Sequence, residues 1–380
     1  MEISPERLVD SHMKKVLMIP NHSYMFWQFR RELVQGLVAR GCDVTLAVPF
    51  GERVDDLRNL GIHLIDTPMD RRGIAPVKEL SLIRQYQTII DRVQPDLVIT
   101  YSIKPNIYAG SICSSRNIPF YMNVQGIGTA FQIPGMAQIV TNMYRRAAKQ
   151  ARVVFFENQE NAKLFRDKRI VRPEQQLVLS GAGINLEHYA PAPYPHNDRV
   201  HFLYLGRLMK EKGIDELFSA VRRLYAEGET FFLDLVGFFE ESYKEQVEEL
   251  EKLGICRFHG FQMETRPYYA QADCVVLPSY HEGMSNVLLE SAAIGRPVIT
   301  SDIPGCREAV DHGSTGFTCP ARDAYALYET MKKFLTLSRE TREAMGIAGT
   351  AKMRSQFDKR QVVEATLAAI FKESHHEAVH

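Results

Sequence analysis

Short runs of apolar residues alternate with amphipathic segments along the chain from Val16 onward. Apolar runs of this kind are typical of strands buried on both faces of a parallel sheet, and the segments between them have helical spacing. A helix is predicted at 29–40, because Gly41 follows it. Strands are predicted at 16–20, 43–48, 63–65, 97–100, 120–124, 153–156 and 177–179, and then at 201–205, 231–236, 256–259, 274–277 and 298–300. The pattern indicates an α/β protein with two doubly wound, Rossmann-like sheets.

A proline-containing segment at 190–197 separates the two halves, with Pro191, Pro193 and Pro195 within five residues. Proline removes a backbone donor and disfavours helix, so we expect this segment to link two domains that face a cleft. The N-terminal domain is expected at 13–190 and the C-terminal domain at 191–350, followed by a terminal helix and a polar tail over 351–380. Residues 1–12 are left out of this interpretation, because a natural-looking start follows at Met13.

The composition is that of an ordinary globular protein, with 45% hydrophobic and 24% charged residues among 380. Lys and Arg number 46, as do Asp and Glu, and this balance argues against a nucleic-acid-binding protein. Residues 1–190, however, hold 24 Lys and Arg against 18 Asp and Glu. Residues 97–156 contain no acid but several bases, namely Lys104, Arg116, Arg145, Arg146, Lys149 and Arg152. We expect this region to attract an anionic partner or an anionic membrane surface, although a chance gap in acidic residues gives the same pattern.

Several kinds of site are excluded by motifs that the sequence lacks. The loop after the first predicted strand, 20–26, has no Gly-x-Gly-x-x-Gly, and no phosphate-binding Gly-x-x-x-x-Gly-Lys-Ser/Thr occurs anywhere, so NAD, FAD and a P-loop are not expected. The six cysteines are widely spaced, which argues against a zinc site or a disulfide scaffold and favours a reducing compartment. No run of about eighteen apolar residues is present, so no spanning helix is expected. His259 and His281 are interpreted as structural rather than metal-binding residues.

The loop after the strand at 201–205 carries two cations beside a helix start. It runs from Gly206 and Arg207 to Lys212 and Gly213. Cations at a strand-to-helix turn, next to a helix N-terminus, are suited to a diphosphate. Taken alone the pattern is weak, because Arg and Lys in surface loops are usually only solvated.

A second loop follows the strand at 274–277 and carries two carboxylates, Glu282 and Glu290. Gly283 allows the backbone to approach a ligand, so the amides of Met284, Ser285, Asn286 and Val287 are predicted to point at phosphate oxygens. Carboxylates beside an anion site make sense if they bind hydroxyl groups of a sugar and a ribose. The alternative is that both are ordinary acids near a helix N-terminus, where the helix dipole favours them.

These residues resemble the motifs of retaining glycosyltransferases of family 4. Glu282 and Glu290 match the Glu-x7-Glu motif, Gly206 to Gly213 matches a second signature, and 302–308 matches the loop that usually follows. The similarity runs from Met13 over nearly the whole chain and implies the GT-B fold, in which the final helix crosses back to the first domain.

The resemblance also implies roles for the site residues. Arg207 and Lys212 would neutralise the diphosphate of a nucleotide-sugar donor, most often a UDP-sugar, and the amides after Gly283 would hold it. Glu290 would bind the ribose, and Glu282 the transferred sugar. No Asp-x-Asp stands at a strand end, so neither a metal ion nor another cofactor is expected.

The first domain resembles the subgroup that extends lipid-linked glycans in bacteria, such as capsule and O-antigen. The matching stretches are Phe29-Arg30, 103–108 and 125–131. A glycan on polyprenyl diphosphate is then the expected acceptor, with Asn21, Lys104 and Asn106 as candidate ligands. Gln125, next to Gly126, stands where many members carry a His that contacts the transferred sugar. Gln cannot titrate, which favours front-face retention, in which the departing phosphate takes the acceptor proton.

The sequence also suggests a cellular location for the protein and two alternative functions. A cytoplasmic enzyme bound peripherally at the inner face of the plasma membrane fits the acceptor, and the aromatic and basic residues around Trp27 suit either a membrane interface or the core. A UDP-sugar 2-epimerase has the same two-domain layout and needs no acceptor. A nucleotide-sugar-binding protein that has lost catalysis is the other alternative.

Overall fold

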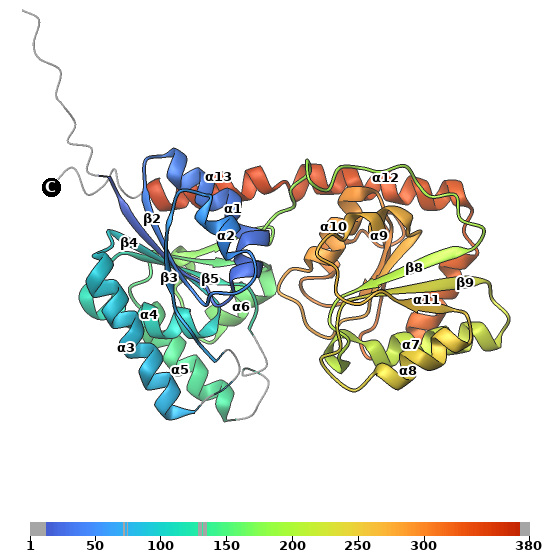
Figure 1. Cartoon of the computed structure of the whole chain (residues 1–380), viewed down its shortest axis with the longest axis horizontal. Helices are drawn as coiled ribbons and strands as arrows, with labels where there is room; N and C mark the ends of the chain where they lie inside the picture. The colour runs from blue at the N-terminus through green and yellow to red at the C-terminus, as the bar shows by residue number, and fades with distance from the viewer. Residues whose placement is uncertain (1–12, 71–72, 74, 128–130, 132–134, 373–380) are drawn as a thin grey trace, which may run out of the picture. The chain divides into compact units, whose positions relative to one another are not determined.

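The computed structural model of the chain describes residues 13–70, 73, 75–127, 131 and 135–372. The chain forms two compact units. The first comprises residues up to Phe155, Lys163–Leu177 and Ala365 onward, and the second comprises Phe156–Ala162 and Val178–Glu364. Each unit contains one sheet flanked by helices, as Figure 1 shows. Among the described residues, no helix combines the length and the hydropathy needed to cross a bilayer.

The first unit is built on a seven-stranded sheet in the order β3-β2-β1-β4-β5-β6-β7. The pairings of β1 with β2 and β4, of β2 with β3 and of β4 with β5 are parallel. Helices α1 and α2 pack together, as do α3, α4 and α5, so two groups of helices flank the sheet (Figure 1). The strands are β1 (Lys15–Ile19), β2 (Asp43–Val48), β3 (His63–Asp66), β4 (Leu97–Tyr101), β5 (Phe120–Val124), β6 (Val153–Phe156) and β7 (Gln176–Val178). The helices are α1 (Ser23–Ala39), α2 (Val54–Arg58), α3 (Pro76–Val93), α4 (Ile103–Arg116), α5 (Met136–Ala148) and α6 (Gln159–Asp167), with a 3-10 turn at Pro173–Gln175.

The second unit is built on a six-stranded, fully parallel sheet in the order β10-β9-β8-β11-β12-β13. Helices α7 and α11 pack together, and α10 packs on α9 and α12. The strands are β8 (Val200–Leu205), β9 (Phe231–Val236), β10 (Cys256–Phe258), β11 (Cys274–Leu277), β12 (Val298–Ser301) and β13 (Gly316–Cys319). The helices are α7 (Ile214–Ala226), α8 (Lys244–Lys252), α9 (Arg266–Gln271), α10 (Asn286–Ile294), α11 (Ala324–Leu335) and α12 (Arg339–Gln356), with 3-10 turns at Lys210–Lys212 and Arg307–Ala309. The last helix, α13 (Lys359–Lys372), begins in the second unit and continues into the first from Ala365.

The strands predicted from the apolar runs are confirmed, and three expectations about other segments are corrected. Strand β13 was not predicted, since only four residues of Gly316–Cys319 pair and the first is glycine. Helix α1 begins at Ser23, six residues before the predicted start, because Ser23 and Phe26 add to its buried face. The predicted terminal helix divides into α12 and α13 at Phe357 and Asp358, where Ile184 pairs with the chain through Phe357 and Lys359.

Burial of every cysteine thiol follows from these cores. All six cysteines are free and buried. Burial raises the pKa of Cys113 and of Cys319 to about 12, and it raises the pKa of the other four thiols too.

The proline-containing segment expected to link the domains packs against the second unit instead. Tyr194 donates a hydrogen bond to the Asp273 carbonyl oxygen at 2.8 Å. The Arg296 guanidinium, 1% exposed, donates to the carbonyl oxygens of Ala192 at 3.1 Å and Pro193 at 2.6 Å. It also binds carbonyls at the ends of α9 and α10, those of Tyr269, Ala270, Ile294 and Gly295. One buried cation therefore joins the segment to two helix ends, whose partial negative charge it offsets.

We predict that Arg296→Met destabilises the second unit by about 3–5 kcal/mol, because buried carbonyls lose their donors. Thermal unfolding followed by circular dichroism should show a melting temperature lower by roughly 10 °C. Arg257→Met is the matched control, since Arg257 is exposed on β10 and its loss should change stability by less than about 0.5 kcal/mol. Equal melting temperatures for the two variants would contradict the assigned role of Arg296.

Candidate functional site

The strand order of the second unit places two loops side by side. Strands β8 and β11 are parallel neighbours, with Phe202 opposite Cys274, yet the chain continues from β8 to β9 on one side and from β11 to β12 on the other. Loops that leave such a pair in opposite directions open a crevice at the carboxyl ends of the strands. The loop after β8 holds Arg207 and Lys212, and the loop after β11 holds Glu282.

Lys212 and Glu282 make the central contact of this site. The Lys212 ammonium lies 2.5 Å from Glu282 Oε1, and the Ser279 hydroxyl donates to the same oxygen at 2.8 Å. Their side chains are 19% and 14% exposed, so the pair is screened only partly by water. Gly213 permits the approach of the two loops: a Cβ at this position would lie 2.1 Å from the Pro278 carbonyl oxygen. The sequence prediction that these two residues share a site is consistent with this geometry.

Arg207 lies on the same loop with a more open side chain. Its backbone carbonyl accepts a hydrogen bond from the buried Tyr204 hydroxyl at 2.6 Å, which fixes the start of the loop. Its guanidinium is 39% exposed and lies 3.7 Å from Glu240, a longer and weaker ion pair than that of Lys212. Gly206 lies beneath it, in contact with Gly237 after β9. Arg207 can therefore turn toward an added anion at little cost.

The turn before α10 offers fewer free amides than the sequence suggested. The Ser285 amide donates to the Gly305 carbonyl oxygen at 2.8 Å, so it is already used. The Gly283 carbonyl accepts from the Asn158 side chain at 2.6 Å. Met284 is buried against Gly181. Within the described part of the chain, the amides of Asn286 and Val287 donate no hydrogen bond, and these first two helical positions are the ones that can bind an anion.

Glu290 lies on the buried side of α10. Its side chain is 6% exposed, and Oε2 accepts a hydrogen bond from the Tyr269 hydroxyl at 2.8 Å. Burial raises the pKa of Glu290 to about 7, although hydrogen bonds from Tyr269 and Tyr189 oppose the shift. Tyr269 and Tyr189 both hydrogen-bond to this carboxyl group, so its orientation is fixed before any ligand binds.

In the first unit, Gln125 and Ser102 lie together at the ends of neighbouring strands. The Ser102 hydroxyl donates to Gln125 Oε1 at 3.2 Å. Ser102 has φ +71 and ψ 168, a conformation that side chains other than glycine rarely adopt and that costs about 1–3 kcal/mol. Asn21 follows β1, the other neighbour of β4, so all three residues stand at the carboxyl edge of the sheet, together with Gly126. Such strain is concentrated at functional sites.

Two candidate acceptor residues have structural roles instead. The Lys104 ammonium binds the carbonyl oxygens of Asp70 and Gly73 and the Glu79 carboxylate, each at 2.6 Å, so its three donors are used. Asn106 is 0% exposed and binds the Thr100 hydroxyl at 2.7 Å and the Asn123 carbonyl at 2.9 Å. Neither side chain is free to bind a diphosphate, so Lys104 and Asn106 are no longer candidate acceptor ligands.

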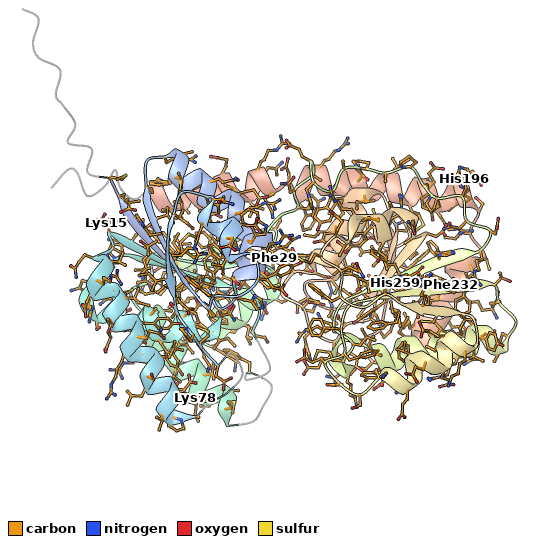
Figure 2. The ribbon with its side chains drawn as sticks, in the orientation of Figure 1. Lys15, Phe29, Lys78, His196, Phe232 and His259 are labelled. Atoms are coloured by element: carbon orange, nitrogen blue, oxygen red, sulfur yellow. The ribbon has the colours of Figure 1, made fainter. Side chains whose placement is uncertain are left out.

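The aromatic cluster and the histidines singled out in the sequence are also placed. Phe26 packs edge-on against Tyr101, with 5.6 Å between ring centroids, while Arg31 covers Trp27. His259, labelled in Figure 2, binds Asp234 Oδ1 at 2.8 Å, and His201 binds Oδ2 at 3.1 Å. Burial opposes ionisation of Asp234, but these two hydrogen bonds hold its pKa below the usual value. Across the described ranges, no group of three or more His, Cys, Asp or Glu side chains could hold a metal ion.

Sequence reasoning missed three residues of these sites: Ser102, Asn158 and Tyr269. Ser102 and Asn158 stand directly after β4 and close after β6, and a polar residue at a strand end was the available signal. The backbone conformation of Ser102 and the contact of Tyr269 with Glu290 depend on packing, which the sequence does not display.

Two families of known proteins match the chain over most of its length. Residues 15–158 match the family described as glycosyl transferase 4-like, and residues 191–352 match glycosyl transferases group 1. A Campylobacter jejuni protein, N,N'-diacetylbacillosaminyl-diphospho-undecaprenol alpha-1,3-N-acetylgalactosaminyltransferase, is 24% identical over 327 residues, which are 81% of this chain and 86% of that protein. Glycogen synthase of Mycobacterium tuberculosis is 32% identical over 176 residues, covering 45% of this chain and only 42% of that enzyme.

A solved structure agrees with the fold. HepE from Anabaena, in complex with UDP and glucose, matches with a TM-score of 0.76 at 16% identity, over 94% of this chain and 100% of that chain. At this identity the likeness establishes the fold alone, and the predicted GT-B fold with two Rossmann-like domains is confirmed. The chain therefore combines a glycosyl transferase 4-like first half with a second half that matches glycosyl transferases group 1, and the glycosyltransferase resemblance of its sequence is confirmed.

Proposed function

We propose that the chain transfers a hexose or an N-acetylhexosamine from a UDP-sugar to a saccharide carried on polyprenyl diphosphate, with retention of configuration and without a metal ion. The observation that carries the proposal is the contact of Lys212 with Glu282 at the crevice between the loops after β8 and β11. A cation beside a carboxylate suits a ligand in which a diphosphate adjoins sugar hydroxyls. Names of relatives support the substrates: HepE was solved with UDP and glucose, and the C. jejuni protein is named for a diphospho-undecaprenol acceptor.

The part of the proposed site that binds the donor stabilises the departing diphosphate. As the glycosidic C–O bond to the diphosphate breaks, negative charge grows on the phosphate, and Arg207 and Lys212 stabilise it. The free amides of Asn286 and Val287 add the positive end of α10. Glu282 then binds hydroxyls of the transferred sugar, and Glu290 accepts hydrogen bonds from the ribose hydroxyls beside those from Tyr269 and Tyr189.

In the proposed reaction, Gln125 binds the transferred sugar and Asn21 binds the acceptor. Gln125 accepts a hydrogen bond from Ser102, so its amide NH2 is oriented as a donor. An amide cannot take a proton, so the acceptor hydroxyl attacks the anomeric carbon from the face that the diphosphate leaves. The new C–O bond forms on that face, and a departing phosphate oxygen takes the hydroxyl proton.

The acceptor also sets the proposed location. A polyprenyl diphosphate is held in a membrane, so the enzyme would bind at the inner face of the plasma membrane. The basic first half supports this location, since Arg145, Arg146 and Lys149 are exposed on one helix end. Anionic lipids attract such residues by about 1 kcal/mol each near the surface.

We predict that UDP-GlcNAc or a related UDP-sugar yields free UDP only when isolated bacterial membranes supply an acceptor. Lipid-extractable radiolabel from the donor measures the transfer. Formation of ManNAc or UDP-ManNAc from UDP-GlcNAc without membranes would instead establish the 2-epimerase. Binding of UDP-GlcNAc and related UDP-sugars without any turnover would instead establish a nucleotide-sugar-binding protein that has lost catalysis.

We predict that Lys212→Met lowers kcat by about 10²–10³, because one stabilising cation is lost from the leaving group. Lys210→Met is the matched control, since Lys210 belongs to the same turn and is exposed. Thermal unfolding of both variants separates a folding defect from a catalytic one. Similar kcat values for the two variants would remove Lys212 from the site.

A third prediction concerns Glu290 and pH. Its folded pKa of about 7 lies above the value of 4.5 for an unperturbed glutamate, so the folded state binds the additional proton between these values. The stabilisation is complete below pH 4.5 and is lost as pH rises to 7, at a cost of about 3 kcal/mol. Glu290→Gln should therefore raise the melting temperature relative to the parent protein at pH 8 and change it little at pH 5. An equal difference at both pH values would show that Glu290 does not titrate in this window.

A further inference from the structure

A pocket in the first unit is lined by cations, among them Arg145 and Lys149, and it contains none of the residues proposed for donor binding or transfer. It encloses about 330 Å³. Five of its lining residues are basic, none is acidic, and the others are Ile170, Val171, Pro173 and Gln175. The basic residues are Arg145 and Lys149 at the end of α5, Arg166 at the end of α6, and Arg169 and Arg172 in the loop that follows.

The pocket lies at the opposite edge of the sheet from Gln125. The end of α5 precedes β6, and the end of α6 precedes β7. The Arg152 amide donates to the Phe120 carbonyl at 3.0 Å, so the start of β6 lies beside the start of β5. Pocket residues therefore stand at the amino ends of these strands, whereas Gln125, Ser102 and Asn21 follow carboxyl ends. A ligand in the pocket would not be part of the proposed transfer site.

Two of the five cations already have structural partners. The Arg145 guanidinium donates to the carbonyl oxygens of Arg169 at 3.1 Å and Lys168 at 2.8 Å. Arg172 donates to the Lys149 carbonyl at 3.3 Å and to Glu174 at 2.6 Å. The partial negative charge at these helix ends is thus met by Arg145 and Arg172, as is usual for cations at helix C-termini.

The remaining three cations have no such partner. In the described parts of the chain, the side chains of Lys149, Arg166 and Arg169 make no hydrogen bond or ion pair. Arg166 helps to lower the pKa of its neighbour Asp167, but Asp167 does not line the pocket. Cations that share one concavity repel each other, and a bound anion relieves that repulsion. The guanidinium groups suit the oxygens of a phosphate.

Arg169 also stands at a backbone position that glycine would favour. It ends α6 with φ +50, and the Ile170 amide donates to the Phe165 carbonyl at 2.8 Å across the turn. Glycine is the residue favoured at this left-handed position, and a side chain there costs about 1 kcal/mol. An arginine at this position therefore opposes the stability of the turn.

We propose that this basic pocket is a second anion-binding site, which takes a phosphate or diphosphate group carried by a soluble molecule or by a lipid headgroup. Lys149, Arg166 and Arg169 bind the anion, while Arg145 and Arg172 hold the two helix ends in place around it. The site is independent of the donor, so it acts on binding or localisation rather than on the transfer step.

Calorimetric titration of the full chain with inorganic diphosphate at low salt tests the site. Arg166→Gln and Arg169→Gly should each weaken binding about tenfold. Arg92→Gln is the matched control, because Arg92 is an exposed arginine in the last turn of α3 that does not line the pocket; it should weaken binding less than about twofold. All three variants keep Arg207, Lys212 and Glu282, so any diphosphate bound at the donor site contributes equally to each titration.

Stability and lipid measurements complete the test. Arg169→Gly should melt at the same temperature as the parent or higher, because it relieves the left-handed arginine. Flotation with phosphatidylcholine vesicles that contain phosphatidic acid, compared with pure phosphatidylcholine vesicles, shows whether a lipid carries the bound phosphate. If Arg166→Gln and Arg169→Gly weaken vesicle binding more than the control does, while diphosphate does not distinguish the variants, the pocket binds a lipid headgroup. Equal weakening by all three variants, or no saturable binding of either probe, overturns the proposal whether or not UDP-sugar turnover is found.

Discussion

The ion pair between Lys212 and Glu282 is the interaction on which the candidate site depends, because it joins loops that leave neighbouring strands in opposite directions. Its short distance requires Gly213, where a side chain would collide with Pro278, and it requires the parallel pairing of β8 with β11. The same pairing places the start of α10 beside the crevice. A diphosphate entering there meets one cation held by a carboxylate and a second, Arg207, that is less constrained. In the proposed reaction, the charge that stabilises the leaving group would therefore be in position before the donor binds.

The fold was predictable because its strands are buried on both faces. Runs such as 202–205 and Cys274–Leu277 are apolar throughout, and this pattern identifies parallel strands without reference to tertiary structure. Prediction failed where tertiary contacts decide the outcome. Nothing local shows that Arg296 binds the 190–197 segment, so three prolines suggested a free linker. Strand β13 exists because β12 pairs with it, not because Gly316–Cys319 favours a strand by itself.

The same division applies to the candidate site. The family resemblance placed Lys212 and Glu282 in one site, and the pairing of β8 with β11 brings their two loops together. Whether a polar side chain is free depends on neighbours far away in sequence. Lys104 binds residues some thirty positions earlier, Asn106 is enclosed by two strands, and the Ser285 amide is taken by Gly305. These tertiary contacts decide whether a polar group is free to bind a ligand, and a sequence motif alone does not reveal them.

The burial of the six thiols has a practical consequence for work on this enzyme. Maleimides and similar reagents attack the thiolate, which is scarce at neutral pH when burial raises the pKa of every cysteine. The native thiols should therefore react very slowly with such reagents while the chain stays folded. A single cysteine introduced at an exposed position such as Arg146 would be labelled selectively, without removal of the native ones. The enzyme is in this respect ready for fluorescent or spin probes on either unit.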